Sequence, residues 1–200
     1  YSSWLHKKDA SKLIVFCNGW GMDGSAFAHL HSDHFDVLML YDYTVFPDRY
    51  DLKEIASNYS QVSLVSWSIG VWAGQKLFSS QEEFLRRTIA VNGTLCPMHD
   101  TLGIPEAIFE GTLQNYDEAG RKKFYHRMCR EKTIYKYFLQ NQPERSIQNQ
   151  LGELTALKKI LDCTPAEESL YQQTLITDHD LVVPTANQLQ YWQDTRTRTT

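Results

Sequence analysis

The chain of 200 residues lacks any long hydrophobic run and any excess of positive charge. Its longest apolar stretches, such as residues 13–17 and 37–40, fall far short of the about 20 residues that a membrane-spanning helix needs. Lys and Arg total 20 against 24 Asp and Glu, and the formal net charge of −4 gives the molecule no general attraction to nucleic acid or to an anionic membrane. The sequence therefore predicts a soluble protein with neither of these partners.

Cysteine is scarce as well, and its four positions show no metal-binding spacing. We expect Cys17, Cys96, Cys129 and Cys163 to be reduced and mostly buried thiols, as is usual in the cytoplasm. A secretory signal is not visible, although the sequence starts at Tyr1 rather than at Met. These absences predict a cytoplasmic protein that binds no metal ion.

Apolar residues make up 42% of the chain, which is enough for one folded domain with a core. Short apolar runs typical of strands alternate with segments of helical spacing, a pattern that predicts parallel strands joined by crossover helices. The expected strands are residues 12–16, 35–41, 62–65, 88–91, 173–177 and 195–200. The expected helices between them are residues 52–59, 69–78 and 186–192. The sequence thus predicts an α/β fold.

This alternation stops between residues 106 and 161, where no convincing strand is found. Apolar residues in this segment have helix-compatible surroundings, interrupted by Gly and Pro residues that end helices. We expect a helical cap over residues 106–161, inserted into a core formed by residues 1–105 and 162–200.

A glycine-rich loop follows the first expected strand and has three interpretations. Gly19, Gly21 and Gly24 match the dinucleotide-binding pattern G-x-G-x-x-G, with Asp42 placed to bind a ribose hydroxyl. The carboxylate of Asp23 would compete there with the pyrophosphate. Alternatively, the turn serves as an oxyanion loop in which the backbone N–H of Trp20 points into a cleft. The third interpretation is a structural turn that places Trp20 in the core.

A second motif lies between the expected strand 62–65 and the helix 69–78. The residues are Ser66-Trp67-Ser68-Ile69-Gly70, which match G-x-S-x-G with serine at the first small position. A nucleophile on such a turn has a strained backbone, which only small residues two positions away accommodate. The start of the helix also brings the N–H of Ile69 toward a substrate carbonyl oxygen. The motif therefore predicts Ser68 as a nucleophile, with Trp20 and Ile69 as oxyanion donors.

Three segments carry a family resemblance: NGWGMD at residues 18–23, SWSIGVW at 66–72 and NGT at 92–94. Together they resemble the pimeloyl-[acyl-carrier protein] methyl ester esterases of biotin synthesis, and the resemblance extends over essentially the whole chain. It implies an α/β-hydrolase fold with a mostly parallel sheet, helices on both faces and a helical cap. It also implies a serine esterase without a cofactor, which cleaves the methyl ester of a pimeloyl chain on an acyl carrier protein. Trp20 and Trp67 would line its substrate pocket, and Asn18 departs from the family because many relatives have His there.

The catalytic acid is expected in residues 178–184, DHDLVVP, which resemble the acid loop of α/β-hydrolases. Asp180 fits best because it directly precedes the apolar stretch, whereas Asp178 is the competing choice and a simple turn is the structural alternative. In this fold the base follows the acid along the chain. None of the seven histidines follows Asp180, and His179 adjoins it too closely. We therefore expect the catalytic histidine beyond Thr200, and the alternative is a degenerate protein that binds without hydrolysing.

Residues 121–136 are strongly basic in a protein that is acidic overall. A solvated helix face is the ordinary explanation. The functional explanation is a docking surface for an acidic acyl carrier protein, with Arg121, Lys123 and Arg127 as contacts. The competing functions are a nicotinamide-dependent oxidoreductase and a non-catalytic protein that binds the carrier.

Overall fold

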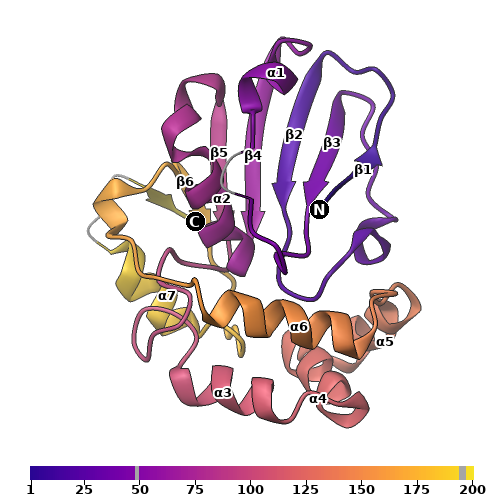
Figure 1. Ribbon diagram of the computed structural model, residues 1–200, viewed down its shortest axis with the longest axis vertical. Coiled ribbons are helices and arrows are strands. Elements are labelled where there is room, and N and C mark those ends of the chain that lie inside the picture. Colours follow the sequence, from indigo (N-terminus) through magenta and orange to yellow (C-terminus); the bar gives the residue numbers. More distant parts are fainter. Residues whose placement is uncertain (48–49, 194–196) are drawn as a thin grey trace.

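The computed structural model describes residues 1–47, 50–193 and 197–200. In these residues, seven strands form one sheet in the order β1-β3-β2-β4-β5-β6-β7 (Figure 1). The strands are β1 (Ser2–His6), β2 (Lys12–Cys17), β3 (Phe35–Leu40), β4 (Gln61–Trp67), β5 (Arg87–Val91), β6 (Gln173–Leu175) and β7 (Arg198–Thr199). Only β1 runs antiparallel to its neighbour, so the carboxyl ends of the other strands meet at one edge.

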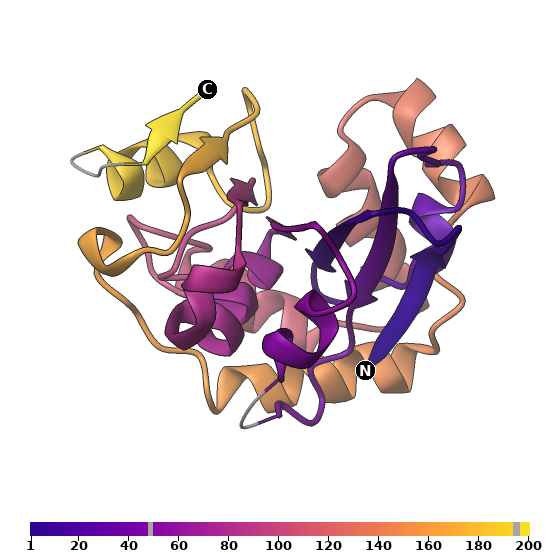
Figure 2. The same ribbon diagram turned by 90° about the horizontal axis from the view of Figure 1, so that it is seen from above.

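Four of the helices lie between β5 and β6 in the sequence and gather at that carboxyl edge. The helices of the described chain are α1 (Leu52–Ala56), α2 (Ile69–Phe78), α3 (Glu106–Gln114), α4 (Glu118–Cys129), α5 (Lys132–Gln140), α6 (Ile147–Lys158) and α7 (Thr185–Trp192). Three short 3-10 turns complete them: η1 (Gly24–Phe27), η2 (Ser79–Phe84) and η3 (Ala166–Glu168). In Figure 1, α6 passes directly beneath the ends of β2, β3 and β4, with α3, α4 and α5 below and beside it. Seen from above, α6 lies on one side of the sheet and the α4–α5 region on the other (Figure 2).

The predicted alternation of strands and helices is confirmed, with differences at the ends of elements. Strand β1 was not predicted, because its sequence SSWLH holds only two apolar residues and the strand lies at the sheet edge. The helix expected over residues 52–59 ends at Ala56, where the side chains of Ser57 and Asn58 bond to the carbonyl of Glu54. The strand expected over 173–177 stops at Leu175. Of the strand expected over 195–200, β7 is present, and residues 195 and 196 lie outside the described residues.

Two apolar clusters hold these elements together. The first fills the space between the sheet and α2, where Leu13, Val15 and Leu64 are fully buried, each worth about 1.5–3 kcal/mol of burial. The second joins the sheet edge to the insertion and contains Trp20, Trp72 and Leu154 among its members. The glycine-rich loop after β2 is therefore packed against α6 rather than exposed.

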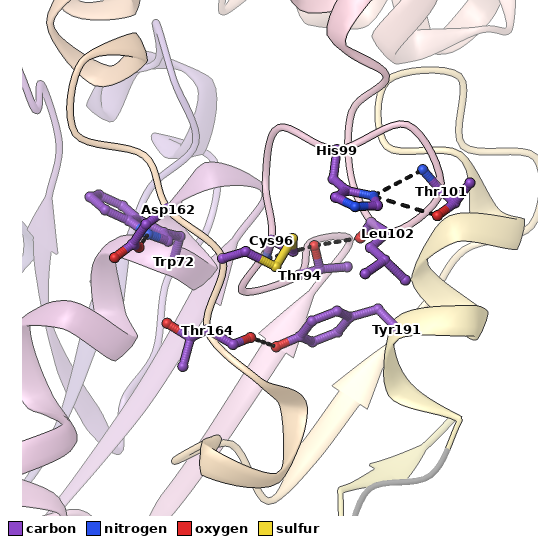
Figure 3. The surroundings of a disulfide bond; sticks show 10 residues. Trp72, Thr94, Cys96, His99, Thr101, Leu102, Asp162, Thr164 and Tyr191 are labelled. Atoms are coloured by element: carbon purple, nitrogen blue, oxygen red, sulfur yellow. Dashed lines mark hydrogen bonds between the residues drawn. A yellow bond between two sulfur atoms is a disulfide. The ribbon is translucent and has the colours of Figure 1, made fainter.

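The prediction of four reduced thiols is wrong for one pair, because Cys96 and Cys163 form a disulfide (Figure 3). Cys96 lies where the chain leaves the core for the insertion, and Cys163 lies where it returns. The two crossings are adjacent, since the N–H of Thr164 donates to the carbonyl of Leu95 at 2.9 Å. The sequence holds no sign of this contact, because 67 positions separate the two cysteines. Cys17 and Cys129 are free and buried, and burial raises the pKa of Cys17 to about 12.

Candidate active site

Ser68 occupies a strained turn between β4 and α2. Its backbone has a φ of 57°, which residues other than glycine rarely adopt. Its N–H donates to the carbonyl of Val91 at 2.9 Å. The neighbours of the turn must be small: a Cβ on Gly70 would lie 2.2 Å from the carbonyl oxygen of Cys17, and one on Gly93 would lie 2.4 Å from that of Ser68. This close packing against the backbone explains why positions 70 and 93 are both glycine.

The loop after β2 lies against this turn. A Cβ added to Gly19 would be 3.4 Å from the Cβ of Ser68. The side chain of Asn18 accepts the N–H of Gly19 at 2.8 Å, so that amide is already used. By contrast, the N–H groups of Trp20 and Ile69 donate to no acceptor within the described part of the chain. The two amides that the sequence predicted as oxyanion donors are therefore free for a ligand.

A cavity of about 520 Å³ opens between these loops and the insertion. This volume lies in the usual range for small-molecule sites. Its wall includes Trp20, Trp67, Ser68 and Ile69 from the core, and Ile108, Phe109, Phe124, Met128, Ile134 and Phe138 from the helices α3 to α5. Exposed apolar side chains, among them Ile134 at 52% and Leu181 at 52%, mark its opening. The arrangement suits an extended apolar ligand with a polar group near Ser68.

The two tryptophans predicted to line the pocket both do so, in different ways. The indole of Trp20 is 6% exposed, and its Nε1 donates to the carbonyl of Gln150 at 2.8 Å. The ring packs against Tyr116 and Phe124, each with a centroid distance of 4.9 Å. The ring of Trp67 lies over Gly19 and makes an edge contact with Phe27.

Asp180 lies on the loop after β6 and lines the same cavity. Its carboxylate accepts the N–H groups of Val182 at 2.8 Å and Val183 at 3.0 Å, and the side-chain amide of Gln188 at 3.1 Å. Burial raises the pKa of Asp180, although these three donors oppose the shift. The competing candidate Asp178 also lines the cavity but is exposed. Among the two, only Asp180 is oriented by hydrogen bonds to its carboxylate.

All seven histidines fall within the described residues, and none of them hydrogen-bonds to Ser68 or Asp180 there. His29 and His179 line the cavity. His29 packs edge-on against Tyr137, and His179 is exposed with a φ of 59°. The described part of the chain thus places Ser68 and Asp180 at one cavity, without a histidine hydrogen-bonded to either of them.

The three basic residues predicted to dock a partner do not share one surface. Arg121 pairs with Glu118 at 3.1 Å and donates to the carbonyl of Arg145. Lys123 is exposed, and Arg127 lines the cavity. At 100° per residue, Lys123 and Arg127 project about 40° apart on α4, whereas Arg121 projects about 160° from Lys123.

A buried polar network beside the loop after β2 was not predicted from the sequence. Gln150 and Glu153 of α6 are both fully buried and bond to the backbone of Gly21. Arg145 bonds to Glu153 at 2.7 Å. The sequence does carry one signal, since Gln150 lies on the helical stripe of Ile147, Leu151 and Leu154 and is polar there.

The same network shows that the dinucleotide interpretation of the glycine loop is wrong. Asp42, the residue expected to bind a ribose, is buried and forms an ion pair with Arg145 at 3.0 Å. The loop leads into η1, a 3-10 turn of four residues, whose N-terminal N–H at Ser25 is capped by Asp23. This short turn does not provide the free N-terminal N–H groups of a long helix that a pyrophosphate needs.

The described residues contain no cluster of three or more His, Cys, Asp or Glu that could hold a metal ion. They also contain no helix that could span a membrane.

The sheet order, the strained serine after β4 and the acid after β6 define an α/β-hydrolase fold. In agreement, the enol-lactonase from Burkholderia xenovorans superposes with a TM-score of 0.67 at 17% identity, over 100% of this chain and 86% of the other. The chain belongs to the pimeloyl-ACP methyl esterase BioG family, whose model matches residues 3–200.

One solved relative shows the same membership, and a second protein is similar over most of this chain. BioG from Haemophilus influenzae has a crystal structure that matches with a TM-score of 0.88 and 32% identity, over 100% of this chain and 90% of that one. A malonyl-[acyl-carrier protein] O-methyltransferase from Bacteroides fragilis is 36% identical over 182 residues, which are 91% of this chain but only 36% of that protein. The resemblance seen in the motifs is thereby confirmed, together with the predicted α/β-hydrolase fold, and membership of a pimeloyl-ACP methyl esterase family supports the main predicted function.

Proposed function

We propose that this chain is a serine carboxylesterase that hydrolyses the methyl ester of a pimeloyl chain carried on an acyl carrier protein. One observation carries the proposal: Ser68 lies on a strained turn at the wall of an apolar cavity, beside two backbone amides that have no acceptor in the described residues. This arrangement supports the proposal, because acyl transfer requires a nucleophile, oxyanion donors and an acyl cavity in one place.

In the proposed reaction, the Ser68 oxygen forms a bond to the ester carbonyl carbon while its proton passes to a histidine base. The N–H groups of Trp20 and Ile69 donate to the resulting oxyanion. Collapse breaks the bond to the methoxy group, which leaves as methanol with the proton from the histidine. Water then attacks the acyl-enzyme, which releases the free carboxylate and restores Ser68. No metal or organic cofactor takes part in these steps.

We propose Asp180 as the residue that orients the base, and a histidine beyond Thr200 as the base itself. Strand β7 is parallel to β6, with Thr174 paired to Thr199. A residue shortly after β7 therefore emerges at the same edge of the sheet as Asp180. The chain order serine, acid, histidine of α/β-hydrolases supports this position.

The proposed partner is an acidic acyl carrier protein, which would dock beside the cavity opening. Arg127 lines the cavity and is partly exposed, and the exposed Lys123 projects from nearly the same side of α4. Arg121 is not part of this proposed surface, because its charge is paired with Glu118. Local positive charge steers association with an acidic partner even though the whole molecule carries a net charge of −4. A carrier-bound substrate also supports the cytoplasm as the proposed location.

Replacement of Ser68 tests the mechanism directly. In the full-length protein, Ser68→Ala should lower kcat on a short methyl ester by at least about 10³-fold and abolish labelling by a fluorophosphonate, because both reactions need the serine oxygen. Ser63→Ala is the matched control, since Ser63 is a buried serine near the start of β4, the strand that leads to Ser68. A folded Ser68→Ala variant that keeps wild-type turnover contradicts the serine mechanism. A wild-type protein that binds the carrier but neither reacts with the probe nor hydrolyses the ester is instead the non-catalytic binding protein.

A further inference from the structure

The Trp20–Gly21 segment is fixed by three bonds to α6, a helix of the insertion. The indole Nε1 of Trp20 donates to the carbonyl of Gln150 at 2.8 Å, and the side-chain amide of Gln150 donates to the carbonyl of Gly21 at 2.7 Å. The N–H of Gly21 donates to the carboxylate of Glu153 at 3.0 Å. The N–H and the carbonyl of Gly21 are therefore both hydrogen-bonded to side chains of α6, while the N–H of Trp20 has no acceptor in the described residues.

The side chains of Gln150 and Glu153 are themselves hydrogen-bonded to other buried groups. Gln150 accepts the hydroxyl of Tyr116 at 3.1 Å and also bonds to the hydroxyl of Tyr125 at 3.0 Å. The second carboxylate oxygen of Glu153 accepts the N–H of Tyr43 at 2.8 Å. Because these groups have no contact with water, a lost partner leaves a buried polar group unsatisfied, which costs about 1–3 kcal/mol.

Gly21 also needs this support for a conformational reason. Its φ of 72° lies in the left-handed region, where the chain turns immediately after Trp20. A glycine has many alternative conformations, so its own backbone does not select this one. The bonds from α6 do, and they set the direction in which the preceding N–H points.

We propose that Gln150 and Glu153 are positioning residues of the oxyanion hole, which hold the Trp20 N–H toward the substrate. This inference rests on the proposed function, in which that N–H stabilises the oxyanion. It assigns α6 a role in catalysis although neither side chain lines the cavity or touches the substrate. The insertion thereby completes the catalytic site in addition to covering it.

The test compares two buried glutamines in the full-length protein. Gln150→Leu removes the donor to Gly21 and keeps the side-chain volume. Gln81→Leu is the matched control, because Gln81 is also buried and bonded to backbone groups at Leu52, Tyr50 and Leu77. It precedes β5, at the end of the sheet opposite to the site, so its loss affects stability alone. Glu153→Gln is the second variant, in which the N–H of Gly21 or that of Tyr43 loses its acceptor and the ion pair with Arg145 is lost as well.

The readouts are kcat and KM for a short methyl ester, and the inhibition constant of a trifluoromethyl ketone, which forms an oxyanion when the serine adds to it. We expect Gln150→Leu to lower kcat about 10- to 100-fold with little change in KM, since loss of one oxyanion donor costs about 10²–10³. Binding of the ketone should weaken by the same factor as kcat/KM. Glu153→Gln should show a smaller change of the same kind, and Gln81→Leu should change neither value more than about twofold.

Two results overturn the inference alone: a folded Gln150→Leu variant with wild-type kcat, or a fall in kcat without weaker binding of the ketone. If Gln150→Leu does not fold, Glu153→Gln decides between the same outcomes. A wild-type protein that neither hydrolyses the ester nor binds the ketone contradicts the proposed function itself, and the inference with it.

Discussion

At the scale of single residues, Gln188 is the support of the proposed acid. It is fully buried on α7, and its side-chain amide donates both to Asp180 at 3.1 Å and to the carbonyl of Val183 at 2.7 Å. The side-chain oxygen of Gln188, Oε1, has no hydrogen-bond partner in the described residues. The carboxylate of Asp180 therefore depends on one side chain and on two backbone N–H groups for its stabilisation.

We predict that Gln188→Leu destabilises the fold in a pH-dependent way. Burial already raises the pKa of Asp180, and loss of the Gln188 donor raises it further. An acid with a raised folded-state pKa contributes stability that is present below its unfolded pKa of about 3.9 and is lost as pH rises through the folded pKa. The deficit of Gln188→Leu relative to wild type should therefore grow between pH 4 and pH 8, as measured by urea unfolding.

The control for this experiment is again Gln81→Leu, whose hydrogen-bond partners are backbone groups that do not titrate. Its deficit should be the same at both pH values. A Gln188→Leu deficit that is likewise constant would show that the bond to Asp180 contributes nothing, and that only the bond to Val183 is lost.

Residues of the candidate site differ in how far the sequence could predict them. Ser68 and Ile69 belong to one contiguous motif, so their spacing carries the geometry of a strand-turn-helix unit. Gln150 and Glu153 act on Gly21 from about 130 positions away, and only tertiary packing brings these parts together. A polar residue on an apolar helical stripe predicts burial, but it does not identify the loop that the residue supports.

At the scale of elements, the two crossings between core and insertion are fastened to each other. Besides the disulfide, the hydroxyl of Tyr191 on α7 donates to the carbonyl of Thr164 at 2.7 Å (Figure 3). On the other side, the indole of Trp72 on α2 donates to Asp162 at 2.7 Å. The returning segment is thus bound to both neighbouring helices, and the disulfide adds a covalent link to the outgoing one.

We predict that the double variant Cys96→Ser/Cys163→Ser unfolds more easily than the oxidised wild type but keeps its kcat. A cross-link over 67 positions restricts the unfolded chain, and the chain-entropy model gives a stabilisation of up to about 4 kcal/mol. The bonds from α6 to Trp20 and Gly21 do not involve either cysteine, so activity on a short ester should stay near the wild-type value.

Thermal unfolding with and without dithiothreitol measures the contribution of the disulfide. The reductant should lower the Tm of the wild type and leave that of the double variant unchanged. Equal Tm values for the wild type in both conditions, with Cys96 and Cys163 alkylated in the native protein, would show that the two thiols are not joined in solution.

At the scale of the whole molecule, the fold could be predicted further than the site. Buried strands that alternate with helices indicate a parallel sheet, because each apolar run is short and is followed by a helical pattern. The four helices between β5 and β6 lie in the segment where that pattern breaks. What the pattern did not contain was the contact between α6 and the loop after β2, on which the proposed positioning role of Gln150 and Glu153 rests.

Charge is distributed unevenly over this molecule, and the last prediction concerns its effect on association. Lys123→Glu should slow hydrolysis of a carrier-bound ester at least about threefold at low salt while hydrolysis of a short ester is unaffected, since a charge at the rim of an interface acts on the association rate. Lys53→Glu on α1 is the matched control: it changes the net charge equally, and Lys53 is exposed at the opposite end of the sheet.

The difference in rate between the Lys123→Glu and Lys53→Glu variants should shrink as salt increases, because the Debye length falls from about 10 Å at 0.1 M to about 3 Å at 1 M. Arg121→Glu should act differently and lower the Tm, since its charge is paired with Glu118 and its guanidinium bonds to the carbonyl of Arg145. Equal rates for Lys123→Glu and Lys53→Glu on the carrier-bound ester would place the docking surface away from α4, and the basic residues there would then be a solvated helix face.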